Sequence, residues 1–172
     1  VVGDTAVCVG ADVQLSSKNL FRSVWTVNDT VASGDVFSFV PSQSTVVSLV
    51  GVDKNQCKVK KNIPITVIPI LSPQILVHPL IHSEKYQLNK DTTEIELEGI
   101  TSAPVDGHYS FYWNFGDGSS VLGGKLEQHT YSRKLVMLNL PIEVTLKVRH
   151  DFGCEGDASI LLQTDPDFKV PN

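Results

Sequence analysis

Asp117, in the run Gly116-Asp117-Gly118, is a candidate acid catalyst by residue type. A catalytic acid works with a second carboxylate or a base beside it, and the sequence around Asp117 offers neither. The run also lacks the lysine and the following helix of a phosphate-binding loop. Glycine and aspartate are typical turn residues, so we expect this segment to turn the chain and not to catalyse a reaction.

Two further groups have the residue types of metal ligands. Asp151, Glu155 and Asp157 surround a predicted hairpin and, with backbone carbonyls, could hold Ca²⁺, which prefers oxygen ligands. Solvated carboxylates in turns are the more common case. His78 and His82 are four residues apart, which would suit a metal on a helix, but the proline between them favours extended backbone. We therefore expect no metal and no cofactor, with calcium at the three carboxylates as the alternative.

Three cysteines could form one disulfide. Cys8 precedes the first predicted strand of the N-terminal half, Cys57 precedes the last strand of that half, and Cys154 is the equivalent of Cys57 in the C-terminal half. We expect a Cys8–Cys57 disulfide with Cys154 as a free thiol, which implies an oxidising compartment. Three reduced and buried cysteines are the alternative, because spacing alone does not establish pairing. The absence of a Cys-x-x-Cys run disfavours a zinc site.

The elements that must position these residues are β-strands. No long 3.6-residue periodicity occurs, whereas alternation of apolar and polar residues recurs along the chain. The clearest run, 142–149, places Ile142, Val144, Leu146 and Val148 on one face. Other strands are expected at 12–16, 24–27, 36–40, 45–52, 64–68, 93–98, 111–115 and 159–163. Short strands separated by Gly, Asn, Asp or Ser are typical of β-sandwiches.

The sequence also repeats itself. Trp25 is echoed by Trp113, and the residues that lead to Cys57 are echoed by those that lead to Cys154. We therefore predict an all-β fold of two tandem antiparallel sandwiches, each with a buried tryptophan. The predicted boundaries are a first domain at 1–69, a short proline-containing linker at 70–74, a second domain at 75–166, and the start of a linker to a further domain at 167–172.

Composition and charge exclude several classes of partner. Hydrophobic residues at 41% and charged residues at 19% are typical of a globular protein. The net charge of −5 argues against nucleic acid, and Lys58, Lys60 and Lys61 form only a short basic patch that usually marks a solvated strand edge. The most apolar stretch, 63–81, contains four prolines, so we expect no membrane insertion. The chain opens without a signal peptide, and we expect it to be a fragment of a longer, processed protein.

A longer motif identifies a fold family. The run Tyr112-Trp113-Asn114-Phe115-Gly116-Asp117-Gly118-Ser119, followed by His129-Thr130-Tyr131 and the strand that ends at Val148, resembles the polycystic-kidney-disease (PKD) type of immunoglobulin-like domain over most of 74–165. The segment 132–140 departs from the family, which usually has a Gly-x-Tyr there. The resemblance, with the tryptophan of the first copy, implies structural roles for Trp25, Trp113, Phe115, Gly116, Asp117, Gly118, His129 and Tyr131. The tyrosine resembles the one that ties a sandwich corner to backbone.

The first module resembles a degenerate version of this domain found in large surface proteins of Bacteroidota. Its opening, 4–15, matches the pattern Asp-Thr-x-x-Cys-x-Gly-x-x-Val-x-Leu that is common there. The last residues, 168–172, resemble the lead-in to the gliding-motility-type C-terminal sorting domain of type IX secretion. In such proteins, Asp-Thr followed by a small or aliphatic residue resembles an O-glycosylation pattern, which Thr5, Thr30 and Thr92 fit. Thr30 also completes a formal N-glycosylation sequon.

These observations imply a non-catalytic module, secreted or at the cell surface, that spaces or presents a larger protein. Its expected partners are other domains of the same polypeptide, surface proteins or polysaccharides. The alternative is a pair of accessory domains of a secreted polysaccharide- or protein-degrading enzyme. A carbohydrate platform would show exposed aromatic residues, whereas both tryptophans are expected in cores, so the first interpretation leads. Because the sequence has no Ser/His/Asp arrangement and no nucleophile elbow, we expect no enzymatic activity in these residues.

Overall fold

The computed structural model describes the chain apart from residues 1–2, 4, 79–86, 89–92, 102–107 and 165–172. The chain divides into two compact units, unit 1 from Val1 to Ile70 and unit 2 from Leu71 to Asn172. The division falls inside the predicted linker 70–74, although a strand of unit 2 already begins at Pro73. In the part of the chain that the structure describes, the regular structure is strand apart from one four-residue helix, so the all-β prediction is confirmed. No helix in the described ranges is long and apolar enough to cross a membrane.

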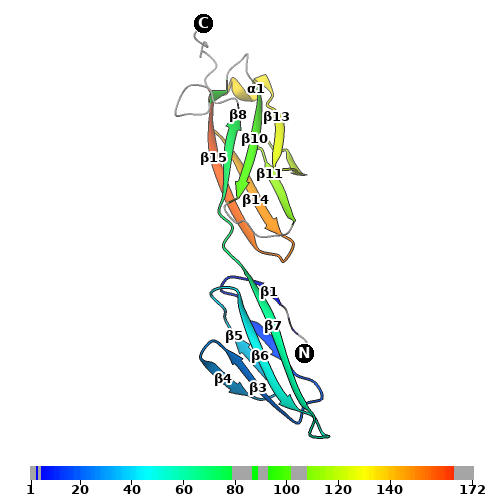
Figure 1. The fold of residues 1–172 in the computed structure, drawn as a ribbon. Helices are drawn as coiled ribbons and strands as arrows, with labels where there is room; N and C mark the ends of the chain where they lie inside the picture. Colours follow the sequence, from blue (N-terminus) through cyan, green and yellow to red (C-terminus); the bar gives the residue numbers. More distant parts are fainter. Residues whose placement is uncertain (1–2, 4, 79–86, 89–92, 102–107, 165–172) are drawn as a thin grey trace. The chain divides into compact units, whose positions relative to one another are not determined.

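Unit 1 is built from two sheets (Figure 1). The larger sheet has the strand order β1-β7-β6-β3-β4, and the smaller one pairs β2 with β5. β1 runs parallel to β7, and the other neighbours are antiparallel. The strands are β1 (Ala6–Cys8), β2 (Val13–Ser16), β3 (Arg22–Val27), β4 (Thr30–Ser33), β5 (Val36–Phe39), β6 (Thr45–Val52) and β7 (Lys58–Ile68).

The core of unit 1 collects alternate residues from these strands. On β3, Ser23, Trp25 and Val27 are buried, whereas Val24 between them is exposed. Trp25 is fully buried, and its ring stacks on that of Phe37 with 6.0 Å between centroids. The indole N–H of Trp25 donates a hydrogen bond to a backbone carbonyl, which satisfies the one polar atom that this side chain takes into the core.

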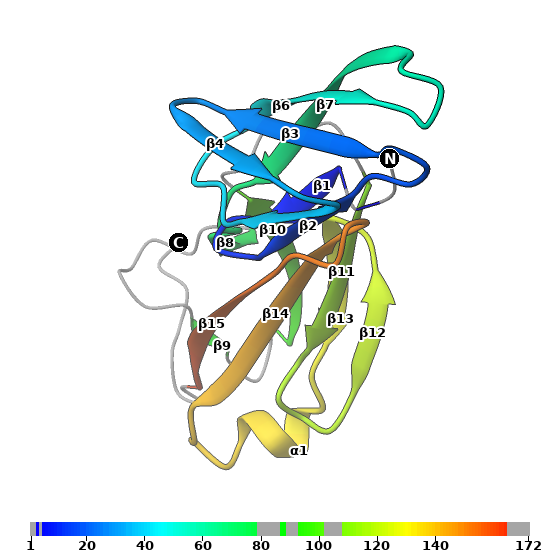
Figure 2. The ribbon, with the colours of Figure 1, turned by 90° about the horizontal axis from the view of Figure 1, so that it is seen from below.

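Unit 2 is a second pair of sheets, with strand orders β13-β10-β8 and β12-β11-β14-β15-β9. β9 runs parallel to β15, and the other neighbours are antiparallel. Figure 2 shows the short helix α1 at one end of this unit, beside β13 and β14. The elements are β8 (Pro73–His78), β9 (Gln87–Leu88), β10 (Glu94–Thr101), β11 (Tyr109–Asn114), β12 (Ser120–Gly123), β13 (Leu126–Thr130), α1 (Arg133–Val136), β14 (Ile142–His150) and β15 (Glu155–Thr164).

The core of unit 2 follows the predicted alternation most clearly on β14. Its four alternate apolar residues are buried, from Ile142 to Val148. α1 begins after Ser132, whose hydroxyl accepts a hydrogen bond from the N–H of Leu135, and it places Val136 in the core. The apolar segment 132–140 therefore contributes a helical turn that covers the core.

The larger sheets of the two units share one topology. These five-stranded sheets match strand for strand, β1-β7-β6-β3-β4 against β9-β15-β14-β11-β12, including the parallel edge pair. Trp25 and Trp113 occupy equivalent strands, β3 and β11, and both are fully buried. Each indole N–H donates to a glycine just after the next strand, to Gly34 at 2.8 Å and to Gly124 at 3.1 Å. The internal repeat of the sequence therefore extends to the hydrogen bonds of the two tryptophan side chains.

Candidate functional site

The turn after β11 gathers most of the residues that could do chemistry. Gly116 and Gly118 adopt positive φ values of 78° and 91°, a region that favours glycine. A Cβ at position 116 would also collide with the backbone carbonyl of Glu143. The N–H of Gly116 donates to the side chain of Asn114 at 2.9 Å. The glycines are therefore required by the backbone path, which holds Asp117 in a fixed place.

Asp117 binds two partners through its two carboxylate oxygens. Oδ1 accepts hydrogen bonds from the hydroxyl and from the backbone N–H of Ser119, the latter at 2.9 Å. Oδ2 lies 2.8 Å from Nε2 of His129, which reaches the turn from β13. Only 17% of the Asp117 side chain and 15% of the His129 side chain are exposed. The carboxylate is therefore held between a hydroxyl and an imidazole that leave a substrate little access.

Aromatic rings close the other sides of this cluster. The ring of His129 stacks on that of Phe115, with 3.9 Å between centroids and 2° between planes. The ring of Tyr131 meets the imidazole edge-on at 4.6 Å. The Tyr131 hydroxyl, in a side chain that is 1% exposed, donates to the backbone carbonyl of Phe115 at 2.8 Å. Tyr131 thus ties β13 to the end of β11, the role that the sequence predicted for it.

Two pKa shifts follow from this packing. Burial by itself raises the pKa of Asp117, but the hydrogen bonds from Ser119 and His129 outweigh it, so the pKa lies below its ordinary value. Burial, reinforced by the negative charge of Asp117, raises the pKa of Tyr131 well above its usual range. Around neutral pH the aspartate is therefore an acceptor, and the tyrosine remains a donor to the Phe115 carbonyl.

The order of the hydrogen bonds decides what this cluster can do. An activated serine needs a base in contact with its hydroxyl, and a carboxylate behind that base. Here the carboxylate of Asp117 lies in the middle, between the Ser119 hydroxyl and the His129 imidazole. Among the described residues the Ser119 hydroxyl contacts no imidazole, and its one basic partner is the Asp117 carboxylate, whose lowered pKa makes it a weak base. The arrangement therefore differs from the order of an activated serine and fits the stabilisation of a turn.

The cysteine prediction is wrong. Cys57 is a free and exposed cysteine, whereas Cys8 and Cys154 are disulfide-bonded. The register explains why Cys8 cannot reach Cys57: Cys8 pairs with Ile68 at the far end of β7, and Cys57 precedes the first residue of that strand. Eleven residues of extended strand separate these ends by about 36 Å, and a disulfide requires about 7 Å or less between Cα atoms.

The three carboxylates considered for calcium take part in ion pairs with basic side chains. Asp151 lies 3.3 Å from the imidazole of His108, and Glu155 and Asp157 lie 3.5 and 4.0 Å from Nζ of Lys147. Within the described ranges, no three His, Cys, Asp or Glu side chains lie close enough to hold a metal ion. His82, the second histidine of the considered pair, lies outside the described residues.

The threonines proposed for glycosylation are partly placed. Thr5 and Thr30 are exposed, and Thr30 begins β4 directly after the two-residue turn of the β3–β4 hairpin. Thr92 lies outside the described residues. Both described threonines are accessible to a modifying enzyme.

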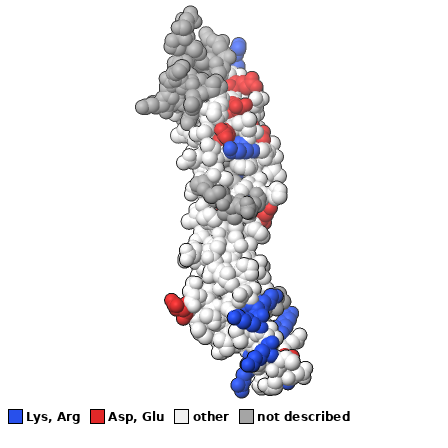
Figure 3. Space-filling view, in the orientation of Figure 1, with Lys and Arg blue, Asp and Glu red and all other residues white. Residues whose placement is uncertain are grey.

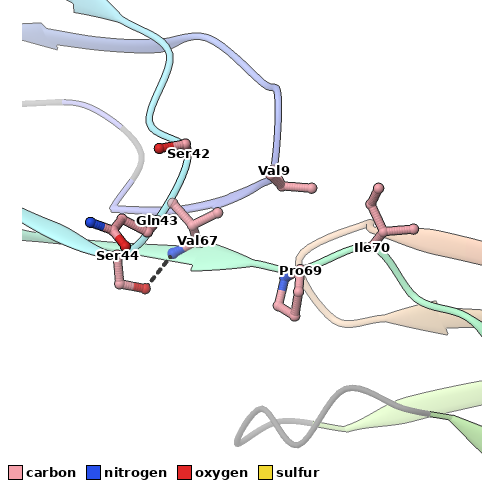
Figure 4. A pocket seen from close by; sticks show the side chains of 7 residues that line it. All are labelled: Val9, Ser42, Gln43, Ser44, Val67, Pro69 and Ile70. Carbon is pink, nitrogen blue, oxygen red and sulfur yellow. Dashed lines mark hydrogen bonds between the residues drawn. The ribbon is translucent and has the colours of Figure 1, made fainter.

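Unit 1 also contains an open pocket of about 530 Å³. Figure 4 shows the Ser44 hydroxyl accepting a hydrogen bond from the backbone N–H of Val67, at 2.9 Å, within this pocket. The lining residues are Val9, Ser42, Gln43, Ser44, Val67, Pro69 and Ile70. None of these side chains is a carboxylate, imidazole, thiol or amine, so the pocket offers apolar walls and neutral polar groups without an acid or a base.

Sequence reasoning missed two polar groups of unit 2. Glu98, on β10, lies 2.9 Å from Nζ of Lys125, and the hydrogen bonds from Lys125 and from His78 lower the pKa of Glu98. His150 is fully buried at the end of β14, where its Nδ1 accepts a hydrogen bond from the N–H of Phe152. Alternation marks position 150 as inward-facing on β14, a signal that extending the predicted strand by one residue would have used.

Comparisons with known proteins found similar solved structures. No protein-family model matches the sequence, and no curated protein does. Among solved structures, the chain is similar to a 1.5-MDa bacterial ice-binding adhesin studied for host cell surface retention, with a TM-score of 0.54 and 12% identity. That match covers 95% of this chain and 61% of the adhesin chain. At this identity the likeness shows the fold alone.

Two further structures resemble the chain more distantly. The fibronectin(III)-like modules of Clostridium thermocellum CbhA match with a TM-score of 0.45 and 12% identity, over 96% of this chain and 91% of theirs. A Ca²⁺-stabilised adhesin with which an Antarctic bacterium binds ice matches with a TM-score of 0.49 and 8% identity, over 94% of this chain and 46% of that chain.

Proposed function

We propose that this chain is a pair of non-catalytic modules of an exported protein, which space a larger polypeptide and present sheet faces and loops to partners. One observation carries the proposal: the cluster best placed for chemistry is used to close a turn. Asp117 is bonded on both oxygens, His129 is stacked on Phe115, and Tyr131 is tied to backbone. A group whose hydrogen bonds and ring faces are taken by its own fold is not available to a substrate.

The disulfide-bonded cysteines support the location. Disulfides persist in secreted and surface proteins and are rare in reducing compartments. Cys8 and Cys154 are disulfide-bonded, which favours an exported protein. The fold likeness to an adhesin is compatible with a surface role. Because one fold carries many functions, the likeness supports the fold and does not identify the function.

Finer assignments rest on sequence motifs. The Trp113-to-Tyr131 motif supports a PKD-type domain in unit 2, and the opening and closing residues of the chain support a Bacteroidota surface protein exported by type IX secretion. The proposed partners are further domains of the same polypeptide and surface proteins or polysaccharides. Thr5, Thr30 and Thr92 are the proposed glycosylation sites, and the proposal includes no metal or cofactor.

The test compares turnover with binding in the full chain. The chain is incubated with panels of polysaccharides and peptides, and new reducing ends and amines are counted against the heat-denatured chain. We expect no product above that control, and saturable binding of the immobilised chain to at least one surface protein or polysaccharide. Turnover that His129→Ala abolishes while the far-UV circular dichroism stays native would refute the proposal, and Tyr112→Phe serves as the matched control for a change outside the cluster.

A further inference from the structure

Positive charge is distributed unevenly between the two units. Unit 1 carries six Lys and Arg against five Asp, whereas unit 2 carries eight Lys and Arg against fourteen Asp and Glu. Figure 3 shows the Lys and Arg side chains of unit 1 gathered at one end of that unit. This end holds the β6–β7 hairpin and the start of β3. The described part of unit 1 therefore carries a basic region, although the chain as a whole has a net charge of −5.

Three of these cations share one sheet face. Lys58 pairs in register with Val52, and Val52 pairs with Arg22, so the three residues form one row across β7, β6 and β3. Lys60, Val50 and Val24 form the next row. We call the solvent-facing set Arg22, Val24, Val50, Val52, Lys58 and Lys60 the basic face. From strand spacings, Lys58 lies about 7 Å from Lys60 along β7 and about 10 Å from Arg22 across the sheet.

The cations of the basic face have no counter-ions of their own. Within the described ranges, every ion pair lies in unit 2, and the six Lys and Arg of unit 1 form none. The nearest acidic side chain of the hairpin, Asp53, accepts hydrogen bonds from the N–H groups of Asn55 and Cys57 instead. Like charges without partners repel one another, so a sheet that keeps them together gains from an external anion.

Apolar surface accompanies the charge. Val24 and Val50, on β3 and β6, are 37% and 47% exposed on the basic face. Phe21, beside the face, is 63% exposed, and the guanidinium of Arg22 lies 5.7 Å from its ring centroid. A pocket of about 280 Å³ is lined by Phe21, Arg22, Val24 and one acidic residue, Asp35, among others. A ligand on this face would therefore meet three cations and, between and beside them, exposed C–H surface.

We infer that the basic face binds an acidic polysaccharide, one that carries a carboxylate or sulfate on its repeating sugars. The inference rests on the proposed function and names the partner class for one of its surfaces. Sugar rings supply the C–H faces that exposed valine and phenylalanine side chains can cover, and their acidic groups meet Arg22, Lys58 and Lys60. Duplex DNA carries about one charge per 1.7 Å, a density that calls for more cations than this face offers.

The experiment measures binding of the full chain to polygalacturonate. Its methyl ester provides the uncharged match, and dextran sulfate provides the sulfated polyanion. A fluorophore on Cys57, which is free, exposed and adjacent to Lys58, gives a second readout at the face itself. We expect saturable binding to one or both polyanions, no binding to the ester, and weaker binding as NaCl rises from about 0.05 M to about 0.5 M.

Two double variants separate the basic face from net charge. Lys58→Glu with Lys60→Glu should weaken polyanion binding by at least about tenfold, because both charges face the ligand. Arg133→Glu with Lys134→Glu makes the same change of charge on exposed residues of α1 and should change binding by less than about twofold. Lys58→Gln with Lys60→Gln repeats the first test without new acidic groups, and circular dichroism checks that each variant is folded.

Three outcomes would overturn the inference: no binding to either polyanion, equal losses in the two double variants, or binding of DNA or anionic vesicles as tight as that of the polyanions. If the chain bound neither polyanion but still bound another partner from the protein and polysaccharide panels, the proposed function would stand and the assignment of this face would fail.

Discussion

Tyr131→Phe removes one buried oxygen from unit 2 and keeps the ring. The hydroxyl donates to the carbonyl of Phe115 at 2.8 Å, and both residues are buried, so the variant leaves that carbonyl without this donor. An unsatisfied buried polar group costs about 1–3 kcal/mol. For a domain of this size such a loss lowers the melting temperature by about 5–15 °C. The perturbation therefore tests whether the cluster around the turn serves stability.

The assay is urea unfolding of the full chain, followed by circular dichroism and tryptophan fluorescence, with Tyr112→Phe as the matched control. Tyr112 is 47% exposed, and its hydroxyl donates to the Ser120 hydroxyl at 3.1 Å on the surface. Water can replace that partner, so the control should change the free energy of unfolding by less than about 0.5 kcal/mol. If Tyr131→Phe and Tyr112→Phe gave the same free energy of unfolding, the structural role assigned to Tyr131 would be wrong.

Two further predictions concern acid stability and thiol chemistry. The folded state lowers the pKa of Asp117 below its ordinary value of 3.8, so the stability that the carboxylate contributes is present above that pH and lost as the pH falls below it. Asp117→Asn should cost about 2 kcal/mol near neutral pH and should flatten the loss of stability below about pH 4, measured by urea unfolding across pH; a parallel pH profile in variant and parent would contradict this. Native chain should release one equivalent of thiolate with Ellman's reagent, and Cys57→Ser should release none, whereas reactivity that persists in the variant would show that another cysteine is free.

The strands that carry the core were predictable because their side chains alternate. The prediction for β14 matches the structure within one residue, since one face is wholly apolar and the other polar. The short edge strands β1, β4, β9 and β12 were not predicted. With two to four residues each, they are too short for a period of two to be read, and they form because a neighbouring strand offers hydrogen bonds.

The sequence prediction made its most consequential error in the length of β7. The sequence 58–61 is polar and basic, so the predicted strand began at 64, whereas β7 begins at Lys58 as the partner of β6. This longer hairpin carries Cys57 to the end of the sheet opposite Cys8 and removes the pairing that the repeat suggested. The start of β7 is set by its hydrogen bonding to β6, and the local pattern of apolar residues does not contain that information.

The candidate site, too, was predictable in its residues but not in their interactions. Its members, among them Phe115, Asp117, His129 and Tyr131, were all singled out by the motif. The hydrogen bonds between these residues could not be predicted. Asp117 lies in the turn after β11 and His129 on β13, and these two strands belong to different sheets. Residue types could be read from the sequence, but the order Ser119–Asp117–His129, which decides against catalysis, needed the three-dimensional arrangement.

Hydrogen exchange of the native full chain, followed by mass spectrometry, tests the central claim most directly. Two duplicated sandwiches predict two separate sets of slowly exchanging amides, one on β3, β6 and β7 around Trp25 and one on β11, β14 and β15 around Trp113. Protection confined to one unit, with the strands of the other exchanging at the rate of an unfolded chain, would contradict the account.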